Sequence, residues 1–206
     1  PQAVFTFRRI GSGAGAVGDH GEYPMNAEQL RHVLRAAASN TGESVFIVVG
    51  SQAILGSFPD APRSLRKSVE SDTYPRDNPA KAIEIDGAIG EGSLFHHEFG
   101  YYAHGVGPET ATVPAGWEQR LVTFEVGDNV GTVGLCLEKH DLAFSKLAAG
   151  RPKDLEFVGE LLKHRLVNRG AMQRLIDAES REEVQSAVKT SWQIVLSRLE
   201  AASRCD

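Results

Sequence analysis

One short segment constrains the fold most strongly: the apolar run Val45–Val49, followed directly by Gly50-Ser51. An unbroken run of β-branched and aromatic residues is typical of a buried strand. Gly50 lets the backbone approach a ligand closely, and Ser51 is expected to open a short helix over about residues 52–55. Free backbone amides at the start of such a helix favour phosphate oxygens. The segment therefore predicts a strand and a glycine turn that face an anionic ligand.

Two acidic residues, Glu70 and Asp72, lie two positions apart in a second expected strand that ends at Pro75. Because strand side chains alternate between faces, both carboxylates project to one side while Ser71 projects to the other. Converging carboxylates are typical ligands of a divalent cation that carries phosphate groups. The pair could instead form the solvated face of an edge strand. We favour the metal site because Gly50-Ser51 precedes it.

A third acid usually completes such a site, and Glu125 is the first candidate. It stands between Phe124 and Val126 in an expected strand over residues 121–126, where a carboxylate is costly unless it has a purpose. The alternative for Glu125 is a partly exposed acid paired with an arginine. Asp86, in a helix expected from Pro79 to about Ile89, is the second candidate.

Composition excludes several classes of protein. The chain has 206 residues, 41% of them hydrophobic, and a formal net charge of -5. This charge argues against a protein covered by nucleic acid, but a local basic patch could still bind an RNA end. Its two cysteines are too few for a disulfide framework, so a reducing cytoplasm is expected. The longest apolar run is too short to span a bilayer, so no membrane association is expected.

The order of the expected elements predicts an α+β fold. It consists of a mixed β-sheet flanked by helices, with strands concentrated in the first two thirds of the chain, and a C-terminal helical region. Residues 1–24 are expected to be an N-terminal extension or an expression remnant, or else an arm packed on the domain. Residues 25–138 should form the core, and residues 139–206 should form helices packed on it. The last helix is expected over Glu182 to Ala202, with an apolar stripe.

Gly50-Ser51, the Glu70-x-Asp72 pair and a later strand acid together resemble the DNA polymerase β type nucleotidyltransferase superfamily. A second block, Ser145–Leu155 (SKLAAGRPKDL), is similar to the helical motif of AbiEii-type toxin nucleotidyltransferases of bacterial type IV toxin–antitoxin systems. The two regions of resemblance are residues 45–72 and 121–167.

This resemblance implies a nucleotidyltransferase-like fold and transfer of a nucleoside monophosphate from an NTP with Mg²⁺ or Mn²⁺. The acceptor would be RNA, tRNA above all, or a protein, and a cognate antitoxin is an expected partner. The implied metal ligands are Glu70, Asp72 and Glu125. Lys146 would lie near the triphosphate and Asp154 would be a further active-site acid, and Arg151 and Lys153 from the same block are expected to contact the nucleotide.

Two further groups of residues have plainer interpretations. His96, His97 and His104 lack a regular metal-ligand spacing, so we expect structural or incidental use. Tyr102 could stack on a base but is more simply a core residue beside a strand. A second hypothesis for function is a nucleotide-binding or antitoxin-type module with weak catalysis, because glutamate stands where the superfamily usually has the first aspartate.

Overall fold

The computed structural model describes residues 24–127, 129 and 131–204. Its centre is a five-stranded mixed sheet with the order β3-β2-β1-β5-β4. The central strand β1 runs antiparallel to β2 and parallel to β5, while β2 and β3 are parallel and β4 and β5 antiparallel. The strands are β1 (Val45–Val48), β2 (Glu70–Pro75), β3 (Tyr102–Gly105), β4 (Val122–Glu125) and β5 (Val133–Cys136). This arrangement confirms the predicted α+β class.

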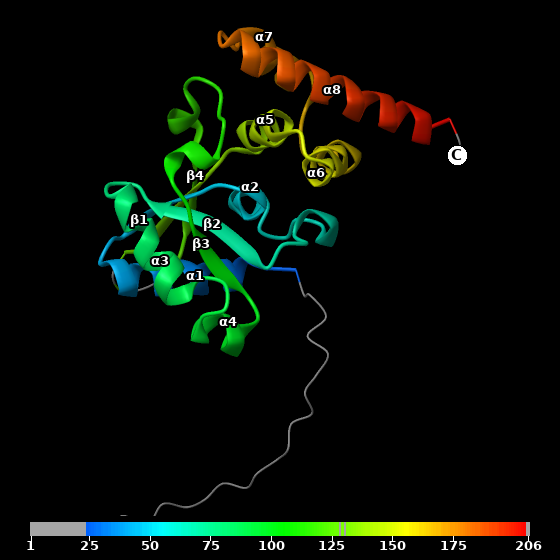
Figure 1. Cartoon of the computed structure of the whole chain (residues 1–206). Coiled ribbons are helices and arrows are strands. Elements are labelled where there is room, and N and C mark those ends of the chain that lie inside the picture. The colour runs from blue at the N-terminus through cyan, green and yellow to red at the C-terminus, as the bar shows by residue number, and fades with distance from the viewer. Residues whose placement is uncertain (1–23, 128, 130, 205–206) are drawn as a thin grey trace, which may run out of the picture.

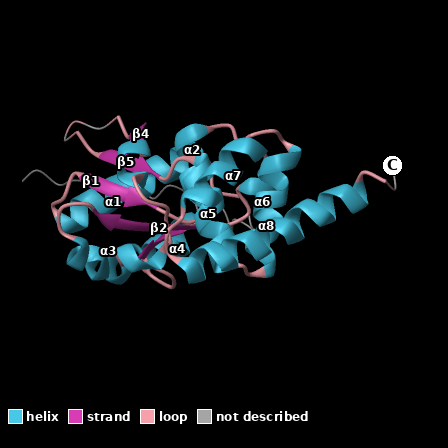
Figure 2. Cartoon of the chain, turned by 90° about the horizontal axis from the view of Figure 1, so that it is seen from above, coloured by secondary structure: helices cyan, strands magenta, loops and turns pink. Residues whose placement is uncertain are grey.

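Helices lie on both sides of the sheet (Figure 1). Helices α1 and α3 pack together on one side, and α3 also packs on β3. Helices α5 to α8 form the C-terminal helical region on the other side, and the far end of α8 projects beyond the rest of the molecule (Figure 2). The helices are α1 (Ala27–Thr41), α2 (Ile54–Ser57), α3 (Ala82–Ile89), α4 (Leu94–Phe99), α5 (Lys139–Ala149), α6 (Pro152–Lys163), α7 (Arg169–Ala178) and α8 (Glu182–Ala202).

Local signals in the sequence account for the ends of α1. Asn26 and Gln29 form a reciprocal capping box, in which each side chain accepts a hydrogen bond from the other residue's backbone amide. Gly42 ends the helix in the left-handed conformation with φ 70°. Between these ends, the buried face of α1 includes Leu30 and Leu34. The helix therefore begins and ends where its own residues satisfy the free backbone groups.

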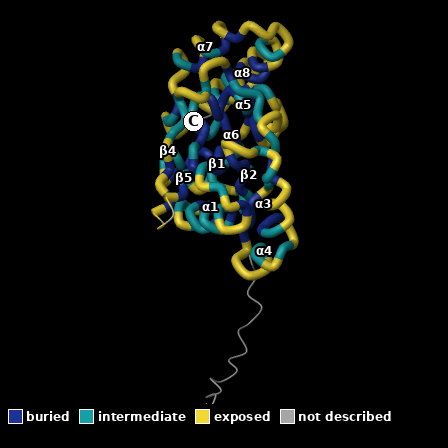
Figure 3. Tube along the Cα trace, turned by 90° about the vertical axis from the view of Figure 1, so that its left-hand side faces the viewer, coloured by how far each residue is buried: buried dark blue, intermediate teal, exposed yellow. Residues whose placement is uncertain are grey.

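The hydrophobic core extends from the central strand into the C-terminal helical region, and the buried segments in Figure 3 include both. Phe46 and Val48 are fully buried because β1 has a strand on each side and helices above and below. The Thr73 hydroxyl donates a hydrogen bond to the Ile47 carbonyl at 2.9 Å and joins β2 to this centre. Both edges of β1 are thus paired, which places the first residues of β2 beside its end.

Helix α4 is the element that the sequence patterns do not predict. It has six residues, none of them fully buried, so it has no long apolar period to reveal it. Its ends are marked by the Ser93 side chain, which accepts from the His96 amide, and by Gly100 in the left-handed conformation. Caps rather than burial define this helix.

Among the described residues, no helix combines the length and the apolar character needed to cross a membrane. The N-terminal extension predicted over residues 1–24 lies outside the described part of the chain, except for Pro24.

Candidate active site

Glu70 and Asp72 lie on the same face of β2, at the end of the sheet where β1 ends. The intervening Ser71 and the following Thr73 are fully buried, whereas both acids are partly exposed. The Val49 amide donates to the Asp72 carbonyl at 2.9 Å, which brings the end of β1 beside the acid pair. The alternation expected from strand geometry is therefore present, with the carboxylates on the open face.

Gly50 lies directly against the Asp72 carboxylate. Its φ is 65°, and a Cβ at this position would lie 2.0 Å from Asp72 Oδ2. A residue with a side chain would therefore be strained and would also collide with the carboxylate. The sequence predicts that the backbone at Gly50 approaches a ligand closely. In the structure, this backbone lies close to Asp72, the second acid of the pair. Ser51, the first residue of a one-turn 3-10 helix (Ser51–Ala53), lines the cavity in front of it.

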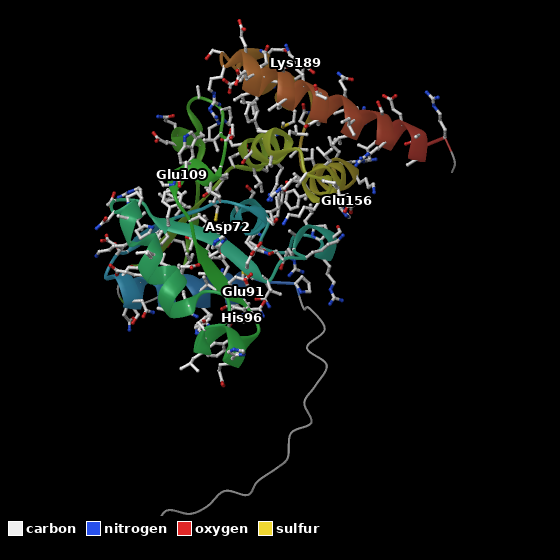
Figure 4. The ribbon with its side chains drawn as sticks, viewed as in Figure 1. Asp72, Glu91, His96, Glu109, Glu156 and Lys189 are labelled. Carbon is white, nitrogen blue, oxygen red and sulfur yellow. The ribbon has the colours of Figure 1, made fainter. Side chains whose placement is uncertain are left out.

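A cavity of about 640 Å³ lies between this edge of the sheet and helices α5 and α6. Figure 4 labels Asp72 on the sheet and Glu156 on α6, which lie on two of the walls of the cavity. The chain between β1 and β2, including the turn Arg63–Leu65, supplies another part of the wall. Of the residues singled out in the sequence, the lining includes Ser51, Glu70, Asp72, Lys146, Arg151, Lys153 and Asp154. Two blocks some 70 residues apart in sequence thus meet at one cavity.

Lys146, Arg151 and Asp154 form one charged network at the helical side of the cavity. Asp154 is 1% exposed, and its carboxylate contacts Lys146 Nζ at 3.1 Å and Arg151 Nε at 2.5 Å. Burial alone would raise the pKa of Asp154, but hydrogen bonds from Arg151 and the charge of Lys146 hold it below its usual value. The buried carboxylate stays charged and fixes two cations at the cavity wall.

Asp72, unlike Asp154, has a pKa above its usual value. Burial, and then the neighbouring charge of Glu70, raise the pKa of Asp72, while His104 and Lys146 act in the other direction. Two carboxylates held close together in a partly buried place repel each other, and a divalent cation would relieve that repulsion. The Arg151 pKa is raised by its bond to Asp154 and further by the charges of Asp72 and Glu70. The network and the acid pair therefore act on each other electrostatically.

Strand β3 brings two residues to the acid pair whose roles the sequence patterns did not reveal. The Tyr102 hydroxyl donates to Glu70 Oε2 at 3.0 Å, and His104 Nδ1 lies 3.2 Å from Asp72 Oδ1. Burial, followed by the charge of Glu70, raises the pKa of Tyr102, so the phenol stays protonated as a donor. The sequence contains one signal for these roles: Tyr102 and His104 are two positions apart, as Glu70 and Asp72 are. The sequence does not show, however, which strands pair. For His104 the sequence predicts structural or incidental use, and its contact with Asp72 is compatible with the structural one.

Glu125 and Asp86 do not join the pair. Glu125 is opposite Val133, which is opposite Val45 at the start of β1, so Glu125 lies at the other end of the sheet from Asp72. Its side chain is exposed on the edge strand β4. The expectation that Glu125 completes the metal site is corrected by this register, because it places Glu125 three strands away from β2 and at the opposite end of the sheet from Asp72. Asp86 is exposed on α3 and is absent from the cavity wall.

Glu70 and Asp72 are the residues here that could hold a cation with hard oxygen ligands. Among the described residues, no group of three or more His, Cys, Asp or Glu side chains is already arranged around one point. A nucleotide-bound cation does not need such a cage, since one or two carboxylates and the phosphates commonly supply its ligands. The donor set therefore fits a cation that arrives with a triphosphate.

A family model described as a nucleotidyltransferase of unknown function (DUF6036) matches residues 27–200. The match spans the sheet and most of the C-terminal helical region, and it includes every residue that lines the cavity. No curated protein and no solved structure matches the chain. The family match confirms the predicted enzyme class at the level of nucleotidyltransferase. The chain therefore belongs to the family of nucleotidyltransferases of unknown function (DUF6036).

Proposed function

We propose that this nucleotidyltransferase binds the triphosphate of an NTP in the cavity between β2 and α6 and transfers the nucleoside monophosphate to RNA. The observation that carries the proposal is the meeting of two charge groups. The acid pair Glu70 and Asp72 lines the cavity on the side of the sheet. The cations Lys146 and Arg151 line it on the side of the helical region. A metal-bound polyphosphate needs both kinds of charge at one place.

The sheet side would hold the cation, with Glu70 and Asp72 as its protein ligands. When bound, Mg²⁺ or Mn²⁺ would neutralise phosphate charge and polarise the phosphorus that is attacked. Gly50 leaves room for the Asp72 carboxylate, and the adjacent Ser51 lies where its hydroxyl could meet a phosphate oxygen. The raised pKa of Asp72, caused by burial and by Glu70, supports this assignment because a cation would stabilise the charged pair.

The helical side would hold the phosphates. Lys146 is mostly buried, and its ammonium lies 5.6 Å from the centre of the Phe157 ring, so it is confined beside the cavity. Asp154 fixes Lys146 and Arg151 but is itself enclosed by them, so we assign it a positioning role. Lys153 is exposed at the cavity and would be free to contact the nucleotide.

In the proposed reaction, an acceptor hydroxyl oxygen forms a bond to the α-phosphorus while the bond to the β-phosphate bridging oxygen breaks. Pyrophosphate leaves with that electron pair, and the hydroxyl proton passes to solvent. Lys146 and Arg151 would stabilise the charge that develops on the leaving group. The resemblance to AbiEii-type toxins, carried by the block around Lys146 and Asp154, suggests that the acceptor is a tRNA end, that the protein is a toxin and that its partner is an antitoxin.

The test is a labelling experiment with purified protein, a divalent cation and each labelled NTP in turn. Total RNA, the protein itself and a candidate partner protein serve as acceptors in separate reactions. We expect label in RNA with the wild type and a loss of at least about 100-fold with Asp72→Ala, because the cation would lose a ligand. The matched controls are Asp86→Ala and Glu125→Ala, which remove exposed acids outside the cavity and should leave transfer unchanged.

Each other outcome has a defined meaning. Wild-type transfer retained by folded Asp72→Ala would refute the assignment of the site. Label in protein alone would replace RNA by a protein acceptor, as expected of an antitoxin-type enzyme that modifies its partner. NTP binding without transfer to any acceptor would instead favour the weakly catalytic binding module.

A further inference from the structure

The two acids of β2 each have a partner directly opposite on β3. The strands are parallel, and their register pairs Glu70 with Tyr102 and Asp72 with His104. Residues that pair across neighbouring strands project to the same face of the sheet, so all four side chains lie on the cavity side. Tyr102 and His104 both line the cavity wall. Strand β3 therefore adds a phenol and an imidazole to the face that carries the carboxylates.

The separation of Asp72 and His104 matches that of two ligands on one cation. Neighbouring ligands of an octahedral cation with bonds of about 2.1 Å lie about 3 Å apart. Asp72 Oδ1 and His104 Nδ1 are 3.2 Å apart, and the His104 side chain is 53% exposed. A cation bound between these two groups would replace their hydrogen bond. The Glu70 side chain would have to turn toward that cation, since among the described residues no three such side chains are already arranged around one point.

The other acids of the cavity wall are less suited to complete a cation site with Asp72. Asp154 is enclosed by Lys146 and Arg151. Glu160 is paired with Lys163, and Glu156 belongs to the opposite wall on α6. Both of the acids proposed from sequence as third ligands lie outside the cavity. Among the described side chains, His104 is the additional metal-binding group that is already in contact with Asp72.

Glu70 is the second carboxylate of the proposed cation site, and a hydrogen bond from Tyr102 orients it. The Tyr102 hydroxyl binds Glu70 Oε2, and its ring packs against His96 of α4 at 4.6 Å between ring centres. Carboxylate ligands of metals are commonly oriented by such outer hydrogen bonds. Tyr102 is therefore a positioning residue, while His104 stands beside Asp72 as a potential ligand.

We propose that His104 is the third protein ligand of the cation held by Glu70 and Asp72, so that the site favours a first-row transition dication such as Mn²⁺ over Mg²⁺. This inference rests on the proposed function. Its chemical basis is that imidazole nitrogen is a good ligand for transition metals, whereas Mg²⁺ prefers oxygen ligands. A carboxylate in place of His104 should move the preference toward Mg²⁺.

The test measures metal binding independently of turnover. Mn²⁺ is titrated into the full chain, alone and with a non-hydrolysable NTP analogue, and free Mn²⁺ is counted by electron paramagnetic resonance. Pulsed measurements then detect coupling between Mn²⁺ and a directly bound ¹⁴N nucleus. We expect ¹⁴N coupling in the wild type, and its loss in His104→Ala with Mn²⁺ binding about tenfold weaker. His104→Asp should also lose the coupling and should lower the preference for Mn²⁺ over Mg²⁺ in competition about tenfold.

His97→Ala is the matched control, because His97 is an exposed histidine of α4 that does not line the cavity. It should keep both the coupling and the wild-type affinity, and circular dichroism verifies the fold of each variant. Stoichiometric Mn²⁺ without ¹⁴N coupling, or coupling that survives in His104→Ala, would overturn the assignment of His104. If that happened while transfer still depended on Asp72, the proposed function would stand without it. If the protein bound neither Mn²⁺ nor Mg²⁺, with or without the analogue, both proposals would fail.

Discussion

At the scale of single residues, Gly50 is a position where two requirements coincide: a backbone conformation that favours glycine, and space for the Asp72 carboxylate. Its left-handed φ of 65° disfavours any residue with a Cβ, and that Cβ would also occupy the space of Asp72 Oδ2. Gly42 has nearly the same backbone conformation, with φ 70°, but a Cβ at this position would have no atom within 4 Å. The two glycines therefore separate the effect of strain from the effect of displacing the carboxylate.

We expect Gly50→Ala to lower transfer by at least about tenfold, because Asp72 must move, and to reduce the free energy of unfolding by about 1–3 kcal/mol. Gly42→Ala should cost only about 1 kcal/mol and leave transfer unchanged. Chemical denaturation and initial transfer rates measure the two quantities. Equal transfer rates in the two variants would show that the contact between Gly50 and Asp72 has no part in catalysis.

At the scale of elements, a salt bridge fastens the link between α7 and α8 to the loop that precedes β4. The Glu179 side chain is 3% exposed and accepts hydrogen bonds from the Arg181 guanidinium at 2.6 and 2.8 Å. The same guanidinium donates to the Val113 carbonyl at 2.8 Å. Hydrogen bonds from Arg181 lower the pKa of Glu179 to about 2, despite the opposing effect of burial. The helical region is thereby joined to the sheet-bearing part of the chain away from the cavity.

This lowered pKa predicts a specific dependence of stability on pH. Because the folded pKa lies below that of the unfolded chain, the stabilisation is complete above about pH 4.5 and is lost as the pH falls through about 2. Glu179→Gln should cost about 1–2 kcal/mol at pH 7, a value reduced by solvent at the half-exposed Arg181. The difference from wild type should vanish near pH 2.

Denaturant unfolding at several pH values measures this difference. Glu183→Gln is the control, since Glu183 is exposed in the first turn of α8. A cost of Glu179→Gln that stays constant from pH 7 to pH 2 would contradict an ionic origin of the link.

At the scale of the whole molecule, the cavity joins the sheet to the C-terminal helical region. The acid pair belongs to β2, whereas Lys146 belongs to α5 and Arg151 caps α6. A ligand that contacts both walls would bind the folded chain and not the unfolded one. Its binding should therefore stabilise the whole molecule.

We expect a non-hydrolysable NTP with a divalent cation, at 100 times its dissociation constant, to add about 2.7 kcal/mol to the free energy of unfolding. Lys146→Met should remove most of that gain, because the phosphates lose a contact on the helical wall. Lys189→Met, a substitution on the outer face of α8, should retain it (Figure 4). Thermal unfolding with and without ligand measures these changes, and an undiminished gain in Lys146→Met would place the triphosphate elsewhere.

The sequence by itself determined most of the elements and pointed to several of the residues that line the cavity, because these depend on local patterns. The capping box of α1, the apolar run of β1 and the alternation of Glu70 and Asp72 each act within a few residues. Similarity of the block around Lys146 then indicated the second wall of the cavity. Weak local signals limit this approach, as the short helix α4 shows, since only its caps define it.

Only the tertiary structure decided which side chains stand beside the acid pair. Strand register places His104 opposite Asp72 and moves Glu125 to the far end of the sheet. Both residues occupy short strands with an apolar neighbour, so their local sequences do not distinguish a site residue from an exposed one. The physical reason is that pairing between strands is set by packing and hydrogen bonds across the whole sheet, which no single segment encodes.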